Sequence, residues 1–285
     1  MHTASKAIEL ALLVATGLLL LGIMSVYSIA ERGLNRRYAV DLTPIALPAA
    51  SDPAILAEGE RLATVRGCFW CHGAALQGQE YFAAAGRGVI VAAPDLTRLR
   101  TEYTAAEFAR AVRHGVTPAG TSVQPAMPAF AYFNMSDDDL GAIMAYIASL
   151  PQQHGLPGQF RLLPVGWLRW AAGALPPNVA ELIDHEAPRP RPGGSQRQHG
   201  RYLAASICSE CHSDSGRIRV PGTPDLNIAR GYSRAQFGQL LRTGAAADGR
   251  PLDSHMVNAA RHRYTRLREA EVDALYAWLS RVDSP

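Results

Sequence analysis

The chain has 285 residues, of which 48% are hydrophobic and 19% are charged. These values are ordinary for a globular protein and allow one large domain or two small ones. The formal net charge is only +3, without the concentrated basic stripe of a nucleic-acid-binding protein, so we expect no nucleic acid among the partners.

An uncharged apolar segment lies near the start of the chain. It runs from Leu10 to Ala30, and a helix of about 20 apolar residues spans the hydrocarbon core of a bilayer. A cleaved signal peptide is the alternative, because Ser28 and Ala30 are small residues where cleavage could occur. The apolar core of a signal peptide usually has only about 7–15 residues. We therefore predict a membrane anchor over residues 1–31 and a proline-containing tether over residues 32–50.

The charges that flank the apolar segment do not set its orientation. Lys6 precedes it, whereas Arg32, Arg36 and Arg37 follow it. This distribution runs against a preference for positive charge on the cytoplasmic side if the rest of the chain is exported. The orientation has to be judged from the motifs that follow.

Capping signals predict three helices in the next stretch. Asp52 and Pro53 form a good N-cap and first-position pair for a helix that leads to the first cysteine motif. Thr104 and Glu107 form a capping box at the start of the second helix, and Ser136 begins the third.

All four cysteines lie in two C-x-x-C-H motifs, which are typical of c-type haem attachment. Two thiols at this spacing at a helix start share one face and can reach the two vinyl groups of a haem, while the histidine stands under the iron. Zinc ribbons usually keep their cysteine pairs about 15–20 residues apart, and thioredoxin-like motifs occur in a βαβ pattern that is missing here. The pattern predicts two covalently bound haem c groups. The motifs are Cys68, Cys71 and His72, and Cys208, Cys211 and His212.

The order of signals around the first motif recurs around the second, which is the mark of an internal repeat. Residues 59–62 are echoed by residues 200–203, and the Pro-Asp-Leu triplet at 94–96 is repeated at 224–226. A second capping box begins at Ser233. We therefore expect two copies of one helical domain joined by a linker. The predicted ranges are 51–152 for the first domain, 153–194 for the Pro-rich linker and 195–285 for the second domain.

The middle of the linker, residues 162–175, is too apolar to be left in water and contains Trp167 and Trp170. We expect it to pack in the crevice between the two domains. Contact with a membrane surface or a partner is the alternative.

Both repeats resemble class I cytochrome c domains, over residues 51–283 apart from the linker. The resemblance implies an all-α architecture, with two tandem class I cytochrome c domains preceded by one N-terminal transmembrane helix. It also implies a methionine as the sixth iron ligand, from a loop before the last helix, and Met127 fits this loop. In this family a proline carbonyl accepts a hydrogen bond from the haem-ligating histidine, and Pro94 and Pro224 match that proline.

The second domain departs from the family pattern at its distal loop. Met256 has the right position, but Val257 replaces the proline that would follow it. His255 and His262 flank the methionine, and imidazole also binds iron well. We predict Met256 as the ligand, with bis-histidine ligation as the alternative.

Histidine and methionine on both irons would leave no vacancy for a substrate, which indicates an electron carrier rather than an enzyme, with a raised reduction potential. Expected partners are a dehydrogenase or quinol-oxidising donor and a cytochrome or terminal oxidase acceptor. In the family that the repeats resemble, haem is attached on the exported face of the membrane. The resemblance therefore implies a single-pass protein of the bacterial inner membrane with its haem domains in the periplasm. A di-haem peroxidase with one open haem site and a haem-based sensor are the alternatives.

Overall fold

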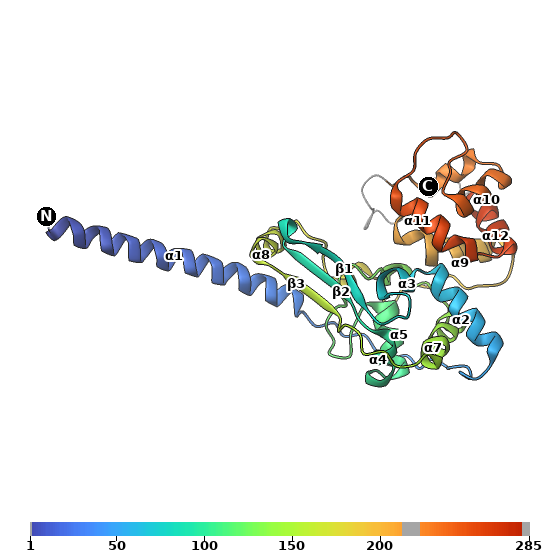
Figure 1. Cartoon of the computed structure of the whole chain (residues 1–285), viewed down its shortest axis with the longest axis horizontal. Coiled ribbons are helices and arrows are strands. Elements are labelled where there is room, and N and C mark those ends of the chain that lie inside the picture. Colours follow the sequence, from blue (N-terminus) through green and yellow to red (C-terminus); the bar gives the residue numbers. More distant parts are fainter. Residues whose placement is uncertain (1, 213–222, 281–285) are drawn as a thin grey trace.

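A single long helix projects from a compact body in Figure 1. The structure, a computed structural model, describes residues 2–212 and 223–280. The predicted second domain extends over two further segments, 213–222 and 281–285, that lie outside the described residues.

The projecting helix is α1 (His2–Leu34). Its part from Ser5 to Leu34 is long and apolar enough to cross a membrane, and it is the one such helix among the described residues. Most of its large apolar side chains are exposed, whereas Ala30 near its end is fully buried against the body. The apolar segment read from the sequence is thus helical and continues beyond the predicted boundary at residue 31.

The first helical unit, residues 53–150, follows an irregular tether. Its predicted helix starts are confirmed: Asp52 accepts a hydrogen bond from the amide of Ala54, Thr104 forms the capping box with Glu107, and Ser136 caps the last helix. The helices are α2 (Pro53–Val65), α3 (Cys68–His72), α4 (Leu96–Glu102), α5 (Ala105–His114), α6 (Ala129–Tyr132) and α7 (Asp137–Ser149).

A small sheet also belongs to this unit, which the all-α expectation omitted. The described residues are mostly helical, with 57% helix and 7% strand, so the expected helical class is confirmed but incomplete. The valine- and isoleucine-rich segment after the first motif suits a strand because β-branched side chains pack well on a pleated surface. The antiparallel order is β1 (Gln79–Ala84), β2 (Val89–Ala93) and β3 (Gln159–Leu162).

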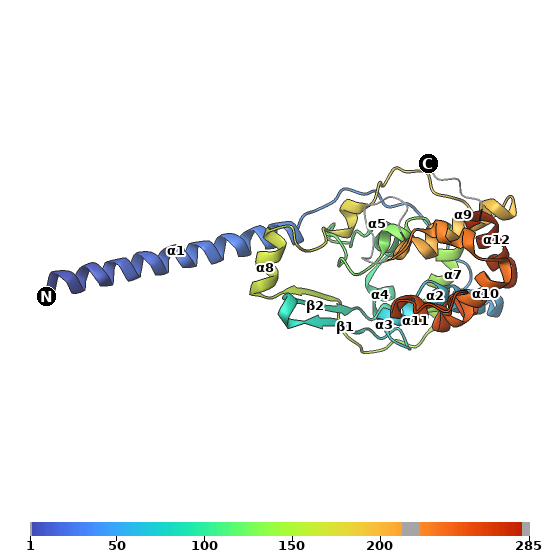
Figure 2. The same ribbon diagram turned by 90° about the horizontal axis from the view of Figure 1, so that it is seen from above.

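The apolar middle of the predicted linker does not pack between the two units. It contributes β3 and then α8 (Pro164–Ala171), which packs against the end of α1. Figures 1 and 2 both show α8 beside that end of α1. The expectation that this segment packs in the crevice between the domains was wrong. The segment pairs with β2, and β2 lies on the side of the first unit that faces α1. A short 3-10 turn, Val179–Leu182, follows.

The second helical unit, residues 196–279, repeats the order of the first around its own cysteine motif. A capping box begins its first helix at Ser195, and another at Ser233 matches the predicted repeat. Its main elements are α9 (Gln196–Ile207), the 3-10 turns Cys208–Glu210 and Leu226–Gly231, α10 (Arg234–Thr243), α11 (Ser254–His262), the 3-10 turn Tyr264–Arg266 and α12 (Glu269–Leu279).

The first and last helices of each unit pack against each other, α2 on α7 and α9 on α12. A buried glycine permits the close crossing in each pair. A Cβ atom on Gly59 would lie 2.1 Å from the carbonyl oxygen of Ala142, and one on Gly200 would lie 1.9 Å from that of Ala274. The repeat that begins with glycine in both halves of the sequence therefore marks the same helix crossing.

Buried polar contacts join the two units. Arg61 of α2 donates to both carboxylate oxygens of Glu271 at 2.9 Å. Arg66, which is fully buried, donates to Asp139 of its own unit and to the hydroxyl of Tyr202 in the other. Because such contacts need exact placement of both partners, they hold the units in one mutual orientation.

Candidate functional site

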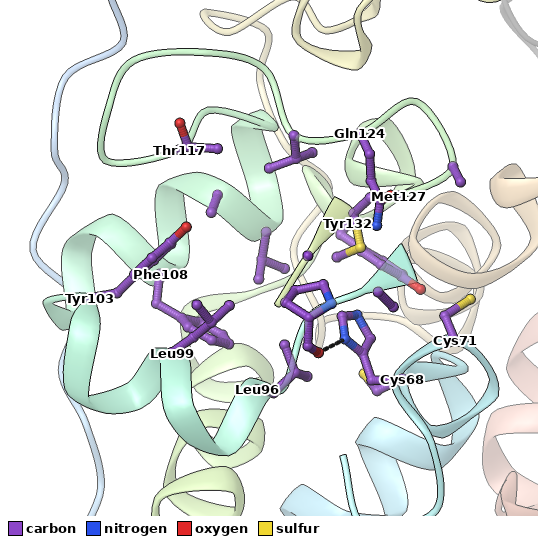
Figure 3. A pocket seen from close by; sticks show the side chains of 18 of the residues that line it. Cys68, Cys71, Leu96, Leu99, Tyr103, Phe108, Thr117, Gln124, Met127 and Tyr132 are labelled. Atoms are coloured by element: carbon purple, nitrogen blue, oxygen red, sulfur yellow. Dashed lines mark hydrogen bonds between the residues drawn. The ribbon is translucent and has the colours of Figure 1, made fainter. Parts of the chain in front are cut away.

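The first helical unit encloses a cavity of about 460 Å³. Figure 3 shows Cys68, Cys71 and Met127 around the same space, reached from different elements. Apolar and aromatic side chains form most of the remaining wall, among them Leu96 and Phe108. A largely apolar cavity with a few polar atoms is the usual form of a cofactor site.

The two thiols of the first motif lie in an environment that disfavours charge. Burial raises the pKa of Cys68 to about 11 and that of Cys71 to about 12. A thioether sulfur carries no charge and suits the same position.

The histidine of the first motif is held in one orientation. Its side chain is buried, and Nδ1 lies 2.8 Å from the carbonyl oxygen of Pro94, the bond dashed in Figure 3. The carbonyl can only accept, so Nδ1 carries the proton and Nε2 keeps its lone pair for a metal. Burial also lowers the pKa of His72, which favours this neutral form.

Asp95 sets the loop that carries this carbonyl. Its buried carboxylate accepts hydrogen bonds from the amide and the hydroxyl of Thr97, and these bonds cap α4. It also accepts from the amide of Gly155, which joins the loop to the segment after α7. The sequence showed this aspartate in both Pro-Asp-Leu triplets without indicating its role. Its N-cap position directly after the histidine-binding proline was the available signal.

Met127 lies on the loop between α5 and α6 and lines the first cavity. The loop begins after Gly115, whose φ of 66° lets α5 end sharply. Backbone hydrogen bonds from Met127 to Gln124 and from Ala129 to Met127 hold the loop in a tight turn. The predicted methionine is therefore presented to the cavity by constrained backbone.

The second unit encloses a cavity of about 600 Å³. Nδ1 of His212 lies 2.8 Å from the carbonyl oxygen of Pro224, as in the first unit, and burial raises the pKa of Cys211. Its motif forms a 3-10 turn where the first motif forms an α-helix. The residues from the predicted site that line this cavity are Cys208, Cys211, His212, Pro224 and Met256.

Met256 lies on a helix and not on the expected loop, because the segment forms α11, which begins after the N-cap Asp253. Met256 is partly buried against the core of the second unit. His255 lines the rim of the cavity, but its side chain is 70% exposed and its Nδ1 lies 2.9 Å from Asp253. His262 is exposed and stacks at an angle beside Trp70 of the first unit, with ring centroids 6.5 Å apart.

The two cavities share part of their walls, which sequence reasoning did not foresee. Beside this shared wall Arg263 donates to both carboxylate oxygens of Glu210 at 2.9 and 2.7 Å, and its Nε donates to the carbonyl of Val65 in the first unit. The charged Glu210 inside a cysteine motif was the available signal, because a buried carboxylate needs a partner. The shared lining residues are Gly67, Cys71, Tyr81, Ala126, Pro128 and Tyr132.

The side chains of both cavities fit haem c. Each presents two cysteines with a histidine whose Nε2 is free for iron, and each has a methionine elsewhere in its wall. Among the residues that the structure describes, no group of three or more His, Cys, Asp and Glu side chains could hold a metal ion directly. Two thiols, one imidazole and one thioether around an apolar cavity are the side chains that a covalently attached haem would use.

Comparison with known proteins agrees with this geometry. Residues 56–151 match the cytochrome c family model. The chain is 26% identical over 272 residues to the fructose dehydrogenase cytochrome subunit of Gluconobacter japonicus, covering 82% of this chain and 54% of that protein. It is 36% identical over 184 residues to the gluconate 2-dehydrogenase cytochrome c subunit of Pantoea cypripedii, covering 57% and 39% of the two chains.

A third relative is similar in length. The chain is 25% identical over 280 residues to a dihaem cytochrome c-type protein of Cereibacter sphaeroides, with 82% of this chain and 90% of the relative covered. By contrast, the chain spans about half the length or less of the dehydrogenase cytochrome subunits that it matches. By their names, these relatives are cytochrome subunits of dehydrogenases and a dihaem cytochrome. The chain therefore contains a region, residues 56–151, that matches the cytochrome c family, and it carries an N-terminal apolar helix.

Proposed function

We propose that this cytochrome holds two haem c groups, one in each cavity, and that electrons pass between them. The observation that carries the proposal is the shared wall, since residues such as Cys71 and Tyr132 line both cavities. Two redox centres on either side of one layer of side chains form a short path for electrons. The second cytochrome c domain, residues 195–285, is part of this proposal and is supported by the matching helix crossings at Gly59 and Gly200.

In this proposal Cys68 with Cys71 and Cys208 with Cys211 form the thioether links. His72 and His212 bind the two irons through Nε2, because Nδ1 is engaged by Pro94 and Pro224. Met127 and Met256 complete the two sites. Haem supplies a one-electron couple, and a neutral histidine with a thioether raises its potential.

The electron donor is proposed to be a dehydrogenase that oxidises a sugar, an alcohol or a sugar acid. The names of the relatives support this class, since they are cytochrome subunits of fructose, alcohol and gluconate dehydrogenases. The acceptor is a second cytochrome or a terminal oxidase.

We also propose that α1 is retained as a single-pass anchor in the inner membrane, with the cytochrome units in the periplasm. The burial of Ala30 supports retention over cleavage. Ala30 packs in one apolar cluster with Val89, Val91 and Leu162 of the sheet. Cleavage at this point would uncover that cluster and remove one of its members.

Haem content and reactivity test the core of the proposal. Mass spectrometry of the denatured full-length chain should show two retained haems and an intact N-terminus. The double variant Cys208→Ser, Cys211→Ser should retain one haem fewer. The reduced protein should not bind carbon monoxide, whereas a peroxidase with an open site would bind it. A single haem, or carbon monoxide binding at one haem, would contradict the two-site carrier.

Purification in a mild detergent tests the partner. A tag on the full-length chain should recover a dehydrogenase, and adding that enzyme's substrate should reduce both haems. The matched control is the Cys208→Ser, Cys211→Ser chain, in which the same substrate should reduce only the remaining haem or none. Recovery of no dehydrogenase would leave the chain a free-standing carrier and overturn this part of the proposal.

A further inference from the structure

Helix α8 carries an apolar face that is largely exposed in the described structure. Val165 and Leu168 are 44% and 57% exposed, and their spacing places them on the same side of the helix. At Gly166 the helix is held close to Gly88, the residue before β2, because a Cβ added to Gly166 would lie 2.1 Å from the carbonyl oxygen of Gly88. The helix therefore cannot roll to hide the exposed face.

α8 lies beside the C-terminal end of the apolar part of α1. Trp167 meets Tyr27 of α1 edge to face, with ring centroids 5.0 Å apart. The indole of Trp170 lies beside Gly33, where an added Cβ would lie 2.5 Å from its nitrogen. Tryptophan and tyrosine gather at the boundary between the hydrocarbon core and the headgroups of a bilayer.

We propose that α8 lies in the membrane interface, with Val165 and Leu168 inserted among the lipids of an anionic bilayer. This inference rests on the proposed retention of α1 as an anchor. The exposed apolar surface of α1 continues as far as Ile29, beside the contact with α8, so a bilayer that surrounds α1 also reaches α8. Short helices with an apolar face and flanking basic residues bind membranes in this way.

Arginines around this region fit lipid phosphates. Within the described residues, the four arginines named at the end of this paragraph are exposed and form no ion pair, whereas Arg36 is paired with Glu181 at 3.0 Å. Anionic headgroups attract basic residues placed next to a membrane-spanning segment. This contact would also explain why arginines follow α1 on the exported side, where the positive-inside preference does not predict positive charge. The four are Arg32, Arg37, Arg161 and Arg169.

The contact would set the height of the first cavity above the membrane. From α8 the chain is linked through β3 to β2, and β2 ends at Ala93, next to the proline that binds His72. Figure 2 shows α8 and the strands between the end of α1 and the helical units. The connection from α8 through β3 to β2 would hold the cytochrome at a fixed distance from a membrane-bound donor.

Photolabelling of the full-length cytochrome tests the inference. The protein is reconstituted in nanodiscs of phosphatidylcholine with phosphatidylglycerol, and the phosphatidylglycerol carries a diazirine in its acyl chain. After irradiation and digestion, label is expected on α1 and on the peptide that contains Val165 and Leu168. Label on α1 alone would overturn the α8 contact but leave the anchor intact, and absence of label from both would contradict the anchor itself.

A charge placed on the exposed face gives the matched comparison. Leu168→Glu should reduce the label on α8 at least threefold and leave the label on α1 unchanged. Leu47→Glu, at a 50% exposed position in the tether, should change neither. Unchanged labelling of α8 in Leu168→Glu, or cross-links from α8 to protein in place of lipid, would overturn the inference. The visible spectrum of each variant reports that both cytochrome units remain folded.

The anionic part is tested by the lipid composition. With the diazirine on phosphatidylcholine, label on α8 should be about twofold higher in nanodiscs that contain phosphatidylglycerol than in pure phosphatidylcholine, because lipid phosphates without a choline cation attract arginine more strongly. Equal labelling in both would overturn the preference for an anionic surface.

Discussion

Gly59 and Ala142 are in direct backbone contact where α2 crosses α7, and Gly200 meets Ala274 in the same way where α9 crosses α12. A methyl group at either glycine would collide with a carbonyl oxygen, which is backbone and cannot turn aside. Each crossing joins the helix that precedes a cysteine motif to the last helix of its unit. The stability of each cavity therefore depends on a residue that does not itself line the cavity.

Gly200→Ala should lower the free energy of unfolding of the second unit by about 1–3 kcal/mol, because overpacking of a close helix crossing forces the backbone apart. Denaturation followed by the visible circular dichroism of the haems measures this loss. Gly231→Ala is the control, since a Cβ there meets nothing within 4 Å, and it should be close to neutral. Equal effects of the two substitutions would contradict the crossing as the cause.

Asp139→Asn should destabilise the first unit and its contact with the second, because Asp139 also accepts a hydrogen bond from the hydroxyl of Tyr202 at 2.5 Å. Arg66 is fully buried, and Asp139 accepts its hydrogen bond at 2.6 Å. Removing the partner of a buried charge costs about 3 kcal/mol or more. Glu102→Gln breaks the pair with Arg98, whose side chains are 43% and 41% exposed, and should cost about 0.5 kcal/mol or less. Chemical denaturation of both variants provides the measurement.

Met256→Ala should abolish one haem's share of the weak charge-transfer band near the red end of the visible spectrum and lower that haem's potential, because a soft thioether favours ferrous iron. The haem next to Met127 should be unchanged. His255→Ala is the control and should leave the band intact, since that side chain is largely in solvent. If Met256→Ala changes neither band nor potential, a histidine is the ligand.

His114 should make the protein less stable at acid pH. Burial, then the nearby His185 and arginines, lower its pKa from 6.5 to about 4. The unfolded chain then binds this proton more tightly than the folded chain does. The free energy of unfolding therefore has its full value above pH 6.5 and falls as the pH drops toward 4. Allowing for partial exposure, the loss is about 1–2 kcal/mol.

Denaturation at several pH values checks this effect. His114→Gln should show a smaller loss between pH 6.5 and 4 than the unchanged chain, with the rest of the acid sensitivity kept by other groups such as His185, whose pKa burial also lowers. The same slope in both proteins would show that another group is responsible.

The sequence by itself determined the features that depend on near neighbours. The caps at Asp52, Thr104 and Ser136 were readable because a side chain bonds to backbone two or three residues away. The two cysteine motifs were readable because their chemistry is set by spacing within five residues. The repeat was visible because both halves keep these signals in the same order.

Only the tertiary structure decided what depends on residues far apart in the chain. The sheet was missed because β3 becomes a strand by pairing Leu162 with Val89, and a short apolar run in a proline-rich segment does not indicate its partner. Met256 lies on a helix, where a loop was expected, because Asp253 caps that helix. The shared wall of the two cavities and the place of α8 beside Tyr27 arise from the packing of whole units, where burial of apolar surface and of paired charges outweighs local preference.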